Sequence, residues 1–243
     1  ALPIWAAYLS KSDLATGMVT EFTELQGEMG REYALLDGEN QRVADAIFEQ
    51  YMPRFAGDIL PSDNVGRALS LADKLDNLAA TFLRGLIPTG SQDPFALRRQ
   101  TIGAVHILTE GKIHWDIRKG IQKALELLPG EEEQKKTTAL QVEDFFRQRI
   151  KTILLDQGID YDVVDAVLTG AVDDIYAVFL KAQAMIDSRI KDEEELRQAV
   201  TRLANITKGK AAVSILPGLF KEEAEKDLQA AFMAALKIGR AHV

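Results

Sequence analysis

The chain has 243 residues, 47% of them hydrophobic and 27% charged, which is enough to bury one sizeable core or two smaller ones. This composition excludes a disordered chain and a collagen-like repeat. The 29 basic and 37 acidic side chains give a formal net charge of −8. The chain is therefore not a generally basic nucleic-acid binder, and contact with nucleic acid would need a local basic patch.

The residue types that build redox and metal sites are scarce. There is no cysteine, hence no disulfide, no thiolate metal site and no cysteine nucleophile, which is typical of proteins in a reducing cytoplasm. Three histidines leave little capacity for metal binding. No uninterrupted apolar run reaches about 18 residues, so the sequence predicts no membrane-spanning segment. The expected location is the cytoplasm, with which the lack of cysteine agrees.

The two ends of the sequence indicate an excised piece of a longer chain. The beginning has neither an initiator methionine nor the layout of a signal peptide, and Trp5, Ala6 and Leu9 already follow a helical spacing. The final residues 239–243 follow an amphipathic helix and are as compatible with an added tail as with native sequence.

Helical periodicity runs through the chain and predicts an all-α, multi-helix fold. Segments 43–48, 142–154 and 163–180 show the spacing of a buried helix face, the last with a break near Gly170. The clearest case is 65–86, which Ser62 or Asp63 could cap. Its apolar positions are Val65, Ala68, Leu69, Ala72, Leu75, Ala79, Phe82, Leu83 and Leu86. The nearest approach to a strand is the short segment 211–216.

Proline, glycine and charge mark three loops, at 53–61, 86–94 and 128–136. The third loop contains a run of charged residues and is the expected boundary between two parts of the chain. The sequence thus predicts a helical domain over 1–130 and a further helical segment over 131–238.

Catalytic constellations are weak. His106 and His114 are eight residues apart and would point about 80° apart on one helix, so they do not form the paired ligands of a zinc site. The sequence contains no phosphate-binding loop of the Gly-x-x-x-x-Gly-Lys type and no Gly-x-Ser-x-Gly elbow. Five carboxylates could be imagined as a metal cluster, but helix caps and solvated faces are the favoured interpretation: Asp13, Glu21, Glu24, Asp73 and Asp76. No metal site is predicted.

Basic residues gather in one part of this acidic chain. Between residues 94 and 125, six basic side chains face two acidic ones, a local balance of +4. The basic ones are Arg98, Arg99, Lys112, Arg118, Lys119 and Lys123. Such side chains could contact phosphates. The alternative is that Arg98 and Arg99 form internal ion pairs with Asp73 or Asp76.

The loop before this basic region carries the residues of a well-specified helix start. Asp93 is a capping residue and Pro94 suits the first helical position. Gly90 permits a positive φ. Phe95 and Leu97 are expected to anchor the loop to the core.

Five stretches of the chain have distinctive sequences in a fixed order. They are LSKSDLATGMVTEFTELQGEMGREYALLDGE (9–39), VADAIFEQYMPRFAGDILP (43–61), ALSLADKLDNLAATFLRGLIPTGSQDPFALRRQTIG (68–103), RLANI (202–206) and ILPGLFKEEAEKDL (215–228). The most specific motifs are ADKLD followed by PTGSQDPFALRR. With these stretches, which cover almost the whole chain, the sequence resembles the β subunit of bacterial glycyl-tRNA synthetase.

The resemblance implies an enzyme of two α and two β chains. In this family the α subunit forms glycyl-adenylate from glycine and ATP with magnesium, and the β subunit mainly recognises tRNA-Gly. The segment would then have no catalytic residue and bind no cofactor itself. Its partners would be the α subunit and tRNA-Gly, with neither membrane nor DNA involved. The implied tRNA-binding candidates are Arg98, Arg99, Arg118 and Lys119.

The family's helical domain is similar to HD phosphohydrolases, whose histidines and aspartates hold a metal that activates water. Here Ser12 and Asp13 stand where the His-Asp pair is expected, and residues 49–51 read Glu-Gln-Tyr where a second histidine segment would lie. Asp73 could replace the terminal aspartate. Isolated carboxylates without imidazole bind a transition metal poorly. A metal-dependent phosphohydrolase therefore remains only as the alternative function.

Overall fold

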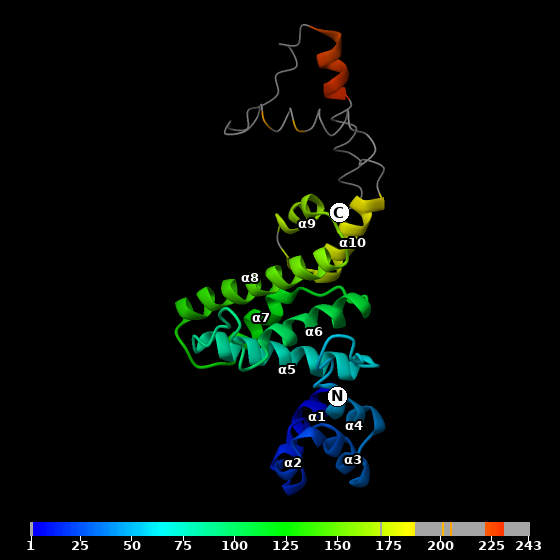
Figure 1. Cartoon of the computed structure of the whole chain (residues 1–243), viewed down its shortest axis with the longest axis vertical. Helices are drawn as coiled ribbons and strands as arrows, with labels where there is room; N and C mark the ends of the chain where they lie inside the picture. The colour runs from blue at the N-terminus through cyan, green and yellow to red at the C-terminus, as the bar shows by residue number, and fades with distance from the viewer. Residues whose placement is uncertain (1, 171, 188–200, 202–204, 206–221, 231–243) are drawn as a thin grey trace. The chain divides into compact units, whose positions relative to one another are not determined.

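The computed structural model describes residues 2–170, 172–187, 201, 205 and 222–230 (Figure 1). These residues form helices and no strand, which confirms the all-α prediction. The chain divides into two compact units, Ala1–Arg189 and Ile190–Val243. Of the second unit, the described residues are 201, 205 and 222–230, and 223–230 form a helix.

The first unit contains ten α-helices and two short 3-10 helices among its described residues. In chain order they are α1 (Leu2–Leu9), η1 (Ser12–Ala15), α2 (Gly17–Glu21), η2 (Thr23–Leu25), α3 (Glu28–Leu36), α4 (Gln41–Glu49), α5 (Asn64–Leu83), α6 (Leu97–Glu110), α7 (Ile117–Glu126), α8 (Glu132–Asp156), α9 (Tyr161–Leu168) and α10 (Ile175–Asp187).

Helix α5 connects two hydrophobic clusters of this unit. Its first turns supply Val65 and Leu69 to a small cluster with α1, α3 and α4. Its later turns supply residues such as Leu78 and Phe82 to a larger cluster with α6 to α10. The apolar spacing read from the sequence produces this long buried face. Asp63 is the cap, since its Oδ1 accepts hydrogen bonds from Val65 N at 2.7 Å and Gly66 N at 3.1 Å.

Helix α8 begins at Glu132, inside the span 128–136 that the sequence predicts as a loop, and it shares the core of the helices before it. It packs on α5, α6 and α7, and the ring of Phe145 lies edge-on to Phe82 with 5.2 Å between centroids. The division predicted after residue 130 therefore does not coincide with the end of the compact unit at Arg189. The charged residues lie in an exposed loop and in the exposed first turn of α8, and the helices on both sides of them share one hydrophobic cluster.

The predicted break near Gly170 is observed, since α9 ends at Leu168 and α10 begins at Ile175. The short strand considered at 211–216 and the tail at 239–243 lie outside the described residues. Within the part of the chain that the structure describes, no helix is both long enough and apolar enough to span a membrane.

Candidate nucleic-acid interface

The start of α6 is built by Asp93, but not in the way the sequence suggests. The Asp93 carboxylate accepts hydrogen bonds from Leu97 N at 2.8 Å and from Arg98 N at 2.9 Å. The helix begins at Leu97, so the predicted start at Pro94 is wrong. Ala96 precedes it with φ 53°, a left-handed conformation that turns the chain before the first helical residue. Alanine rarely adopts this conformation, so no sequence signal marks it.

Arg98 ties the preceding loop together. Its Nη2 donates to the carbonyl oxygen of Gly90 at 2.8 Å, and its Nη1 lies 3.5 Å from the carbonyl oxygen of Gln92. Gly90 has φ 52°, the positive value that the sequence anticipates. Leu97 is buried, whereas Phe95 is 49% exposed and does not anchor the loop as expected. Arg98 therefore links the first turn of α6, which also carries Arg99, to the loop before it.

Arg118 and Lys119 lie in the first turn of α7, behind the capping residue Asp116. Arg118 Nη2 forms an ion pair with Asp173 Oδ2 at 2.8 Å, which links α7 to the turn before α10. The Lys119 side chain is 81% exposed, and its Nζ lies 3.4 Å from Asp116 Oδ2. Arg118 therefore has a structural partner, and Lys119 projects into solvent.

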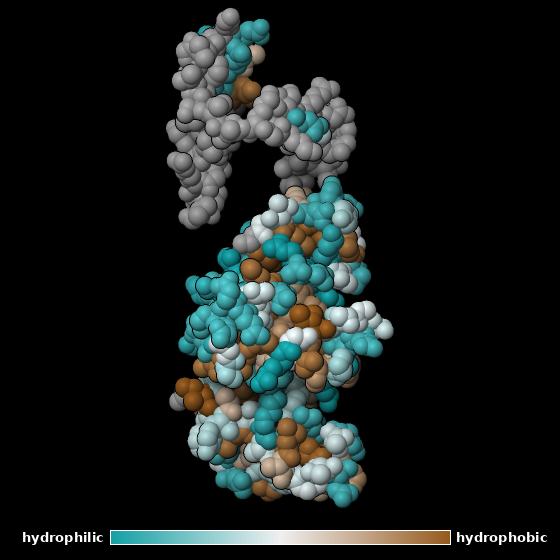
Figure 2. Space-filling model, turned by 90° about the vertical axis from the view of Figure 1, so that its left-hand side faces the viewer, coloured by the Kyte–Doolittle hydropathy of each residue, from teal (hydrophilic) through white to brown (hydrophobic). Residues whose placement is uncertain are grey.

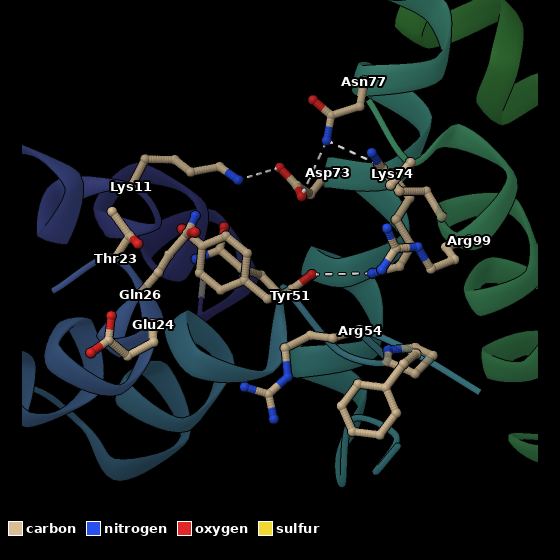
Figure 3. Close-up of a pocket in the computed structure, with 15 residues that line it drawn as sticks. Lys11, Thr23, Glu24, Gln26, Tyr51, Arg54, Asp73, Lys74, Asn77 and Arg99 are labelled. Carbon is tan, nitrogen blue, oxygen red and sulfur yellow. Dashed lines mark hydrogen bonds and ion pairs between the residues drawn. The ribbon is translucent and has the colours of Figure 1, made fainter. Parts of the chain in front are cut away.

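Arg99 differs from the other three candidates because no hydrogen bond or ion pair of its side chain is found among the described residues. It is exposed and lies at the rim of a polar cavity of about 660 Å³ (Figure 3). The cavity wall comes from the segment after α1, from η2, from the end of α4 and the chain after it, and from α5 and α6. Its residues include Lys11, Gln26, Tyr51, Arg54, Asp73, Lys74, Asn77 and Arg99.

The deepest cation of this wall is Lys74, which sequence reasoning did not select. Its side chain is only 3% exposed. The ammonium donates to the carbonyl oxygens of Met52 at 2.8 Å and Gln50 at 3.3 Å, and to Ser70 Oγ at 2.7 Å. Burial lowers the pKa of Lys74 to about 8, against the opposing effect of Asp73. The sequence does indicate that Lys74 is buried, because this residue interrupts the apolar face of α5.

Tyr51 is the other perturbed group of the wall. Burial raises the pKa of its phenol to about 12, the Gln26 side chain opposes this shift, and the charges of Asp13 and Asp73 add to it. The Lys11 ammonium lies 4.7 Å from the centroid of the Tyr51 ring. One face of this ring is therefore covered by a cation of the protein itself.

Of the five carboxylates considered for a metal site, Asp13 and Asp73 have partners in the protein, and so does Glu49 of the segment where a second histidine would lie. Asp13 is buried and accepts a hydrogen bond from Gly27 N at 2.6 Å. Glu49 accepts one from Ser62 N at 2.9 Å. Asp73 forms an ion pair with Lys11. Asp13 lines a second cavity of about 470 Å³, whereas Asp73 lines the first. The residues of the described ranges contain no group of three or more potential metal ligands.

The two histidines considered above also have separate local partners. His106 Nδ1 lies 3.1 Å from Glu110 on α6, and His114 Nδ1 lies 2.7 Å from Asp174. His106 lines a third cavity, whose wall also includes Arg99. The histidines thus follow the interpretation as structural or surface residues, with one carboxylate beside each.

Comparison with known proteins identifies close relatives. The family described as glycyl-tRNA synthetase beta subunit matches residues 4–169. The glycine–tRNA ligase beta subunit of Clostridioides difficile is 48% identical over 223 residues, which make up 91% of this chain and 32% of that protein. The corresponding subunit of Desulforamulus reducens is 46% identical over 226 residues, again 91% of this chain and 32% of the relative.

A third relative, the glycine–tRNA ligase beta subunit of Shouchella clausii, is 43% identical over 232 residues, 93% of this chain and 33% of that protein. The chain spans about a third of the length of the curated relatives it matches. The family match covers more than half of the chain, and it includes the loop of Asp93, the buried Lys74 and the cavity rim with Arg99. The chain belongs to the glycyl-tRNA synthetase beta subunit family.

Proposed function

We propose that this segment contributes to tRNA-Gly binding within a glycine–tRNA ligase and carries out no chemistry of its own. In this proposal the enzyme consists of two α and two β chains in the cytoplasm. The α subunit binds glycine, ATP and magnesium, and the helical segment presents a basic surface to tRNA. The subunit names of the relatives support a role in the ligase.

The observation that carries the proposal is the contrast between Arg99 and Arg98. Arg98 uses its guanidinium to hold the loop at 90–92, while Arg99 is exposed at a cavity rim without a partner among the described residues. A guanidinium without an internal partner can bind two phosphate oxygens at once. We therefore assign direct phosphate contacts to Arg99 and to Lys119, whose side chain is 81% exposed although Asp116 lies 3.4 Å from its ammonium, while Arg98 and Arg118 keep structural partners.

The test is the salt dependence of tRNA affinity in the assembled two-chain enzyme. Each phosphate contact contributes about 0.7 to 0.9 to the slope of log affinity against log salt. Arg99→Ala should weaken tRNA binding and lower that slope by about one. Arg84→Ala is the matched control, because Arg84 is also exposed but lies at the end of α5 outside the cavity wall.

The expected pattern is a lower slope for Arg99→Ala with an unchanged slope for the control and an unchanged melting temperature for both variants. Glycyl-adenylate formation should continue in each. An unaltered slope in a normally folded Arg99→Ala enzyme would remove this residue from the interface. Equal losses for both arginines would mean that overall charge, rather than the cavity rim, governs the affinity.

A further inference from the structure

The polar cavity beside Arg99 has a wall suited to a small anionic ligand. The cations Lys11, Arg54, Lys74 and Arg99 face two carboxylates, Glu24 and Asp73, a formal balance of +2 in a chain of net charge −8. Figure 3 shows these side chains arriving from opposite sides, Lys11 and Glu24 from the N-terminal helices and Asp73 and Arg99 from α5 and α6. A concave site with converging charges is a binding-site geometry.

The available cations differ in how far they are already engaged. Lys74 donates to three protein oxygens, and Lys11 is paired with Asp73. Arg54 forms an ion pair with Asp58, with 3.1 Å between Nε and Oδ2. Arg99 has no partner among the residues that the structure describes. Arg99 is therefore the cation of this wall whose guanidinium is available to a phosphate without breaking an existing pair.

The rest of the cavity wall carries more hydrogen-bonding groups than a phosphate alone would use. Carboxamide groups of Gln26, Gln50, Asn77 and Gln100 provide both donors and acceptors. Asn77 Nδ2 is 3.1 Å from Gln100 Oε1 and 3.4 Å from Asp73 Oδ2, and the side-chain Oδ1 of Asn77 takes part in neither bond. Gln50 is fully buried, and its Oε1 has no hydrogen-bond partner among the described residues. The partly exposed carboxamides of Gln26 and Asn77 match the edge of a nucleobase, whereas Gln50 is closed off from solvent.

An aromatic surface is also open at the cavity. Phe55 lines it and is 56% exposed, with the Arg54 guanidinium 5.9 Å from the ring centroid. Tyr51 is the less accessible ring, because Lys11 lies over it. Phe55 therefore offers a face on which an unstacked base can lie, the usual way in which proteins hold single nucleotides of RNA.

We propose that this cavity binds one nucleoside phosphate, with the phosphate at Arg99 and the base against Phe55 and the carboxamides. The cavity volume of about 660 Å³ lies in the range of small-ligand sites and exceeds what an inorganic phosphate alone needs. The nucleotide can be an unpaired residue of tRNA, a source that rests on the proposed function, or a free nucleotide. Both sources present the same chemistry to the wall.

The test is calorimetric titration of this chain with the four nucleoside 5′-monophosphates, the corresponding nucleosides and inorganic phosphate. At least one monophosphate should bind more tightly than both its nucleoside and inorganic phosphate. Phe55→Ala should weaken it about tenfold, because a stacking face is lost. Phe95→Ala is the matched control, since Phe95 is similarly exposed but lies outside the wall, and it should leave the affinity unchanged.

Arg99→Ala separates the phosphate from the base. It should weaken the monophosphate about tenfold and leave nucleoside binding unchanged. The proposal is overturned if no monophosphate binds better than inorganic phosphate, or if neither Phe55→Ala nor Arg99→Ala changes the affinity. Circular dichroism of each variant keeps loss of fold apart from loss of binding.

A competition experiment then shows whether the bound nucleotide is part of tRNA or a free nucleotide. If the bound monophosphate displaces tRNA from the two-chain enzyme, the site takes a tRNA nucleotide; if both bind together, it takes a free nucleotide. Either result supports a nucleoside-phosphate site. The titration uses no tRNA, so its failure is distinguishable from failure of the proposed tRNA role, which the salt slope measures.

Discussion

Lys11 forms an ion pair with Asp73, with 2.7 Å between Nζ and Oδ1, and this pair joins the segment after α1 to the middle of α5. The sequence resemblance had placed Asp73 at the position of a metal ligand. In the structure an ammonium group neutralises this carboxylate, and Asn77 Nδ2 lies 3.4 Å from its other oxygen. The pair leaves the surrounding wall with an excess of positive charge.

The first prediction concerns the charge of that wall. Asp73→Asn should release Lys11 and raise the formal balance of the cavity wall from +2 to +3, so the two-chain enzyme should bind tRNA more tightly at low salt and with a steeper salt dependence. Asp76→Asn is the control, because Asp76 lies on the same helix, is exposed and is outside the wall. Equal effects of both variants would contradict a role of the cavity.

The second prediction uses the buried ammonium of Lys74. The pKa of its side chain is about 8 in the folded chain, against 10.5 for an exposed lysine. Between these values the unfolded chain binds more protons than the folded one, so the free energy of unfolding should rise with pH. The rise should be on the order of 2 kcal/mol between pH 8 and pH 10.

Tyr51 limits the pH range over which this rise in stability can be measured. The pKa of its phenol is raised from 10.0 to about 12, so the folded chain retains this proton longer and stability falls again above about pH 10. Urea unfolding of the chain at pH 8, 9 and 10 measures the effect. Lys74→Met should lose the rise, and the same pH dependence in this variant would show that another group is responsible.

The third prediction concerns the start of α6. Asp93→Ala removes the acceptors of two helix N–H groups and should lower the free energy of unfolding by about 1 to 2 kcal/mol. Asp93→Asn keeps one acceptor oxygen, so its free energy of unfolding should lie between those of the unmodified chain and Asp93→Ala. Thermal unfolding of the three chains checks this order, and an unchanged melting temperature for Asp93→Ala would argue against the cap.

The fourth prediction tests a close approach between two helices. A Cβ on Gly66 would overlap the carboxylate of the buried Glu49. Alanine normally stabilises a helix relative to glycine, but here Gly66→Ala should destabilise by about 1 to 3 kcal/mol. Gly17→Ala is the control, since no atom lies within 4 Å of its new Cβ. Chemical denaturation of both variants decides, and equal stabilities would contradict the packing argument.

The fifth prediction concerns catalysis. This chain alone should not catalyse glycine-dependent exchange between ATP and pyrophosphate, because the proposal assigns adenylate formation to the α subunit. The measurement is the exchange of labelled pyrophosphate with the isolated chain, and the assembled two-chain enzyme is the positive control. Exchange by the isolated chain would overturn the assignment.

The sequence by itself determined the helical class and most of the helix positions. The buried face of a helix is visible in the spacing of nearby apolar residues. The span 65–86 therefore predicted α5 with an error of three residues at its end, and Asp63 was one of its two expected caps. The sequence also predicted the break between helices near Gly170. Local chemistry also indicated that Asp93 caps a helix, although the left-handed Ala96 moved the helix start to Leu97.

Tertiary structure alone decided which charged residues are free. Arg98 and Arg99 are neighbours with identical chemistry, yet only the fold turns one onto the carbonyl oxygens of its own loop and the other onto a cavity rim. The ion pair of Lys11 with Asp73 and the burial of Lys74 likewise join segments far apart in the chain. Such pairings depend on distances in space, which local spacing along a sequence does not contain.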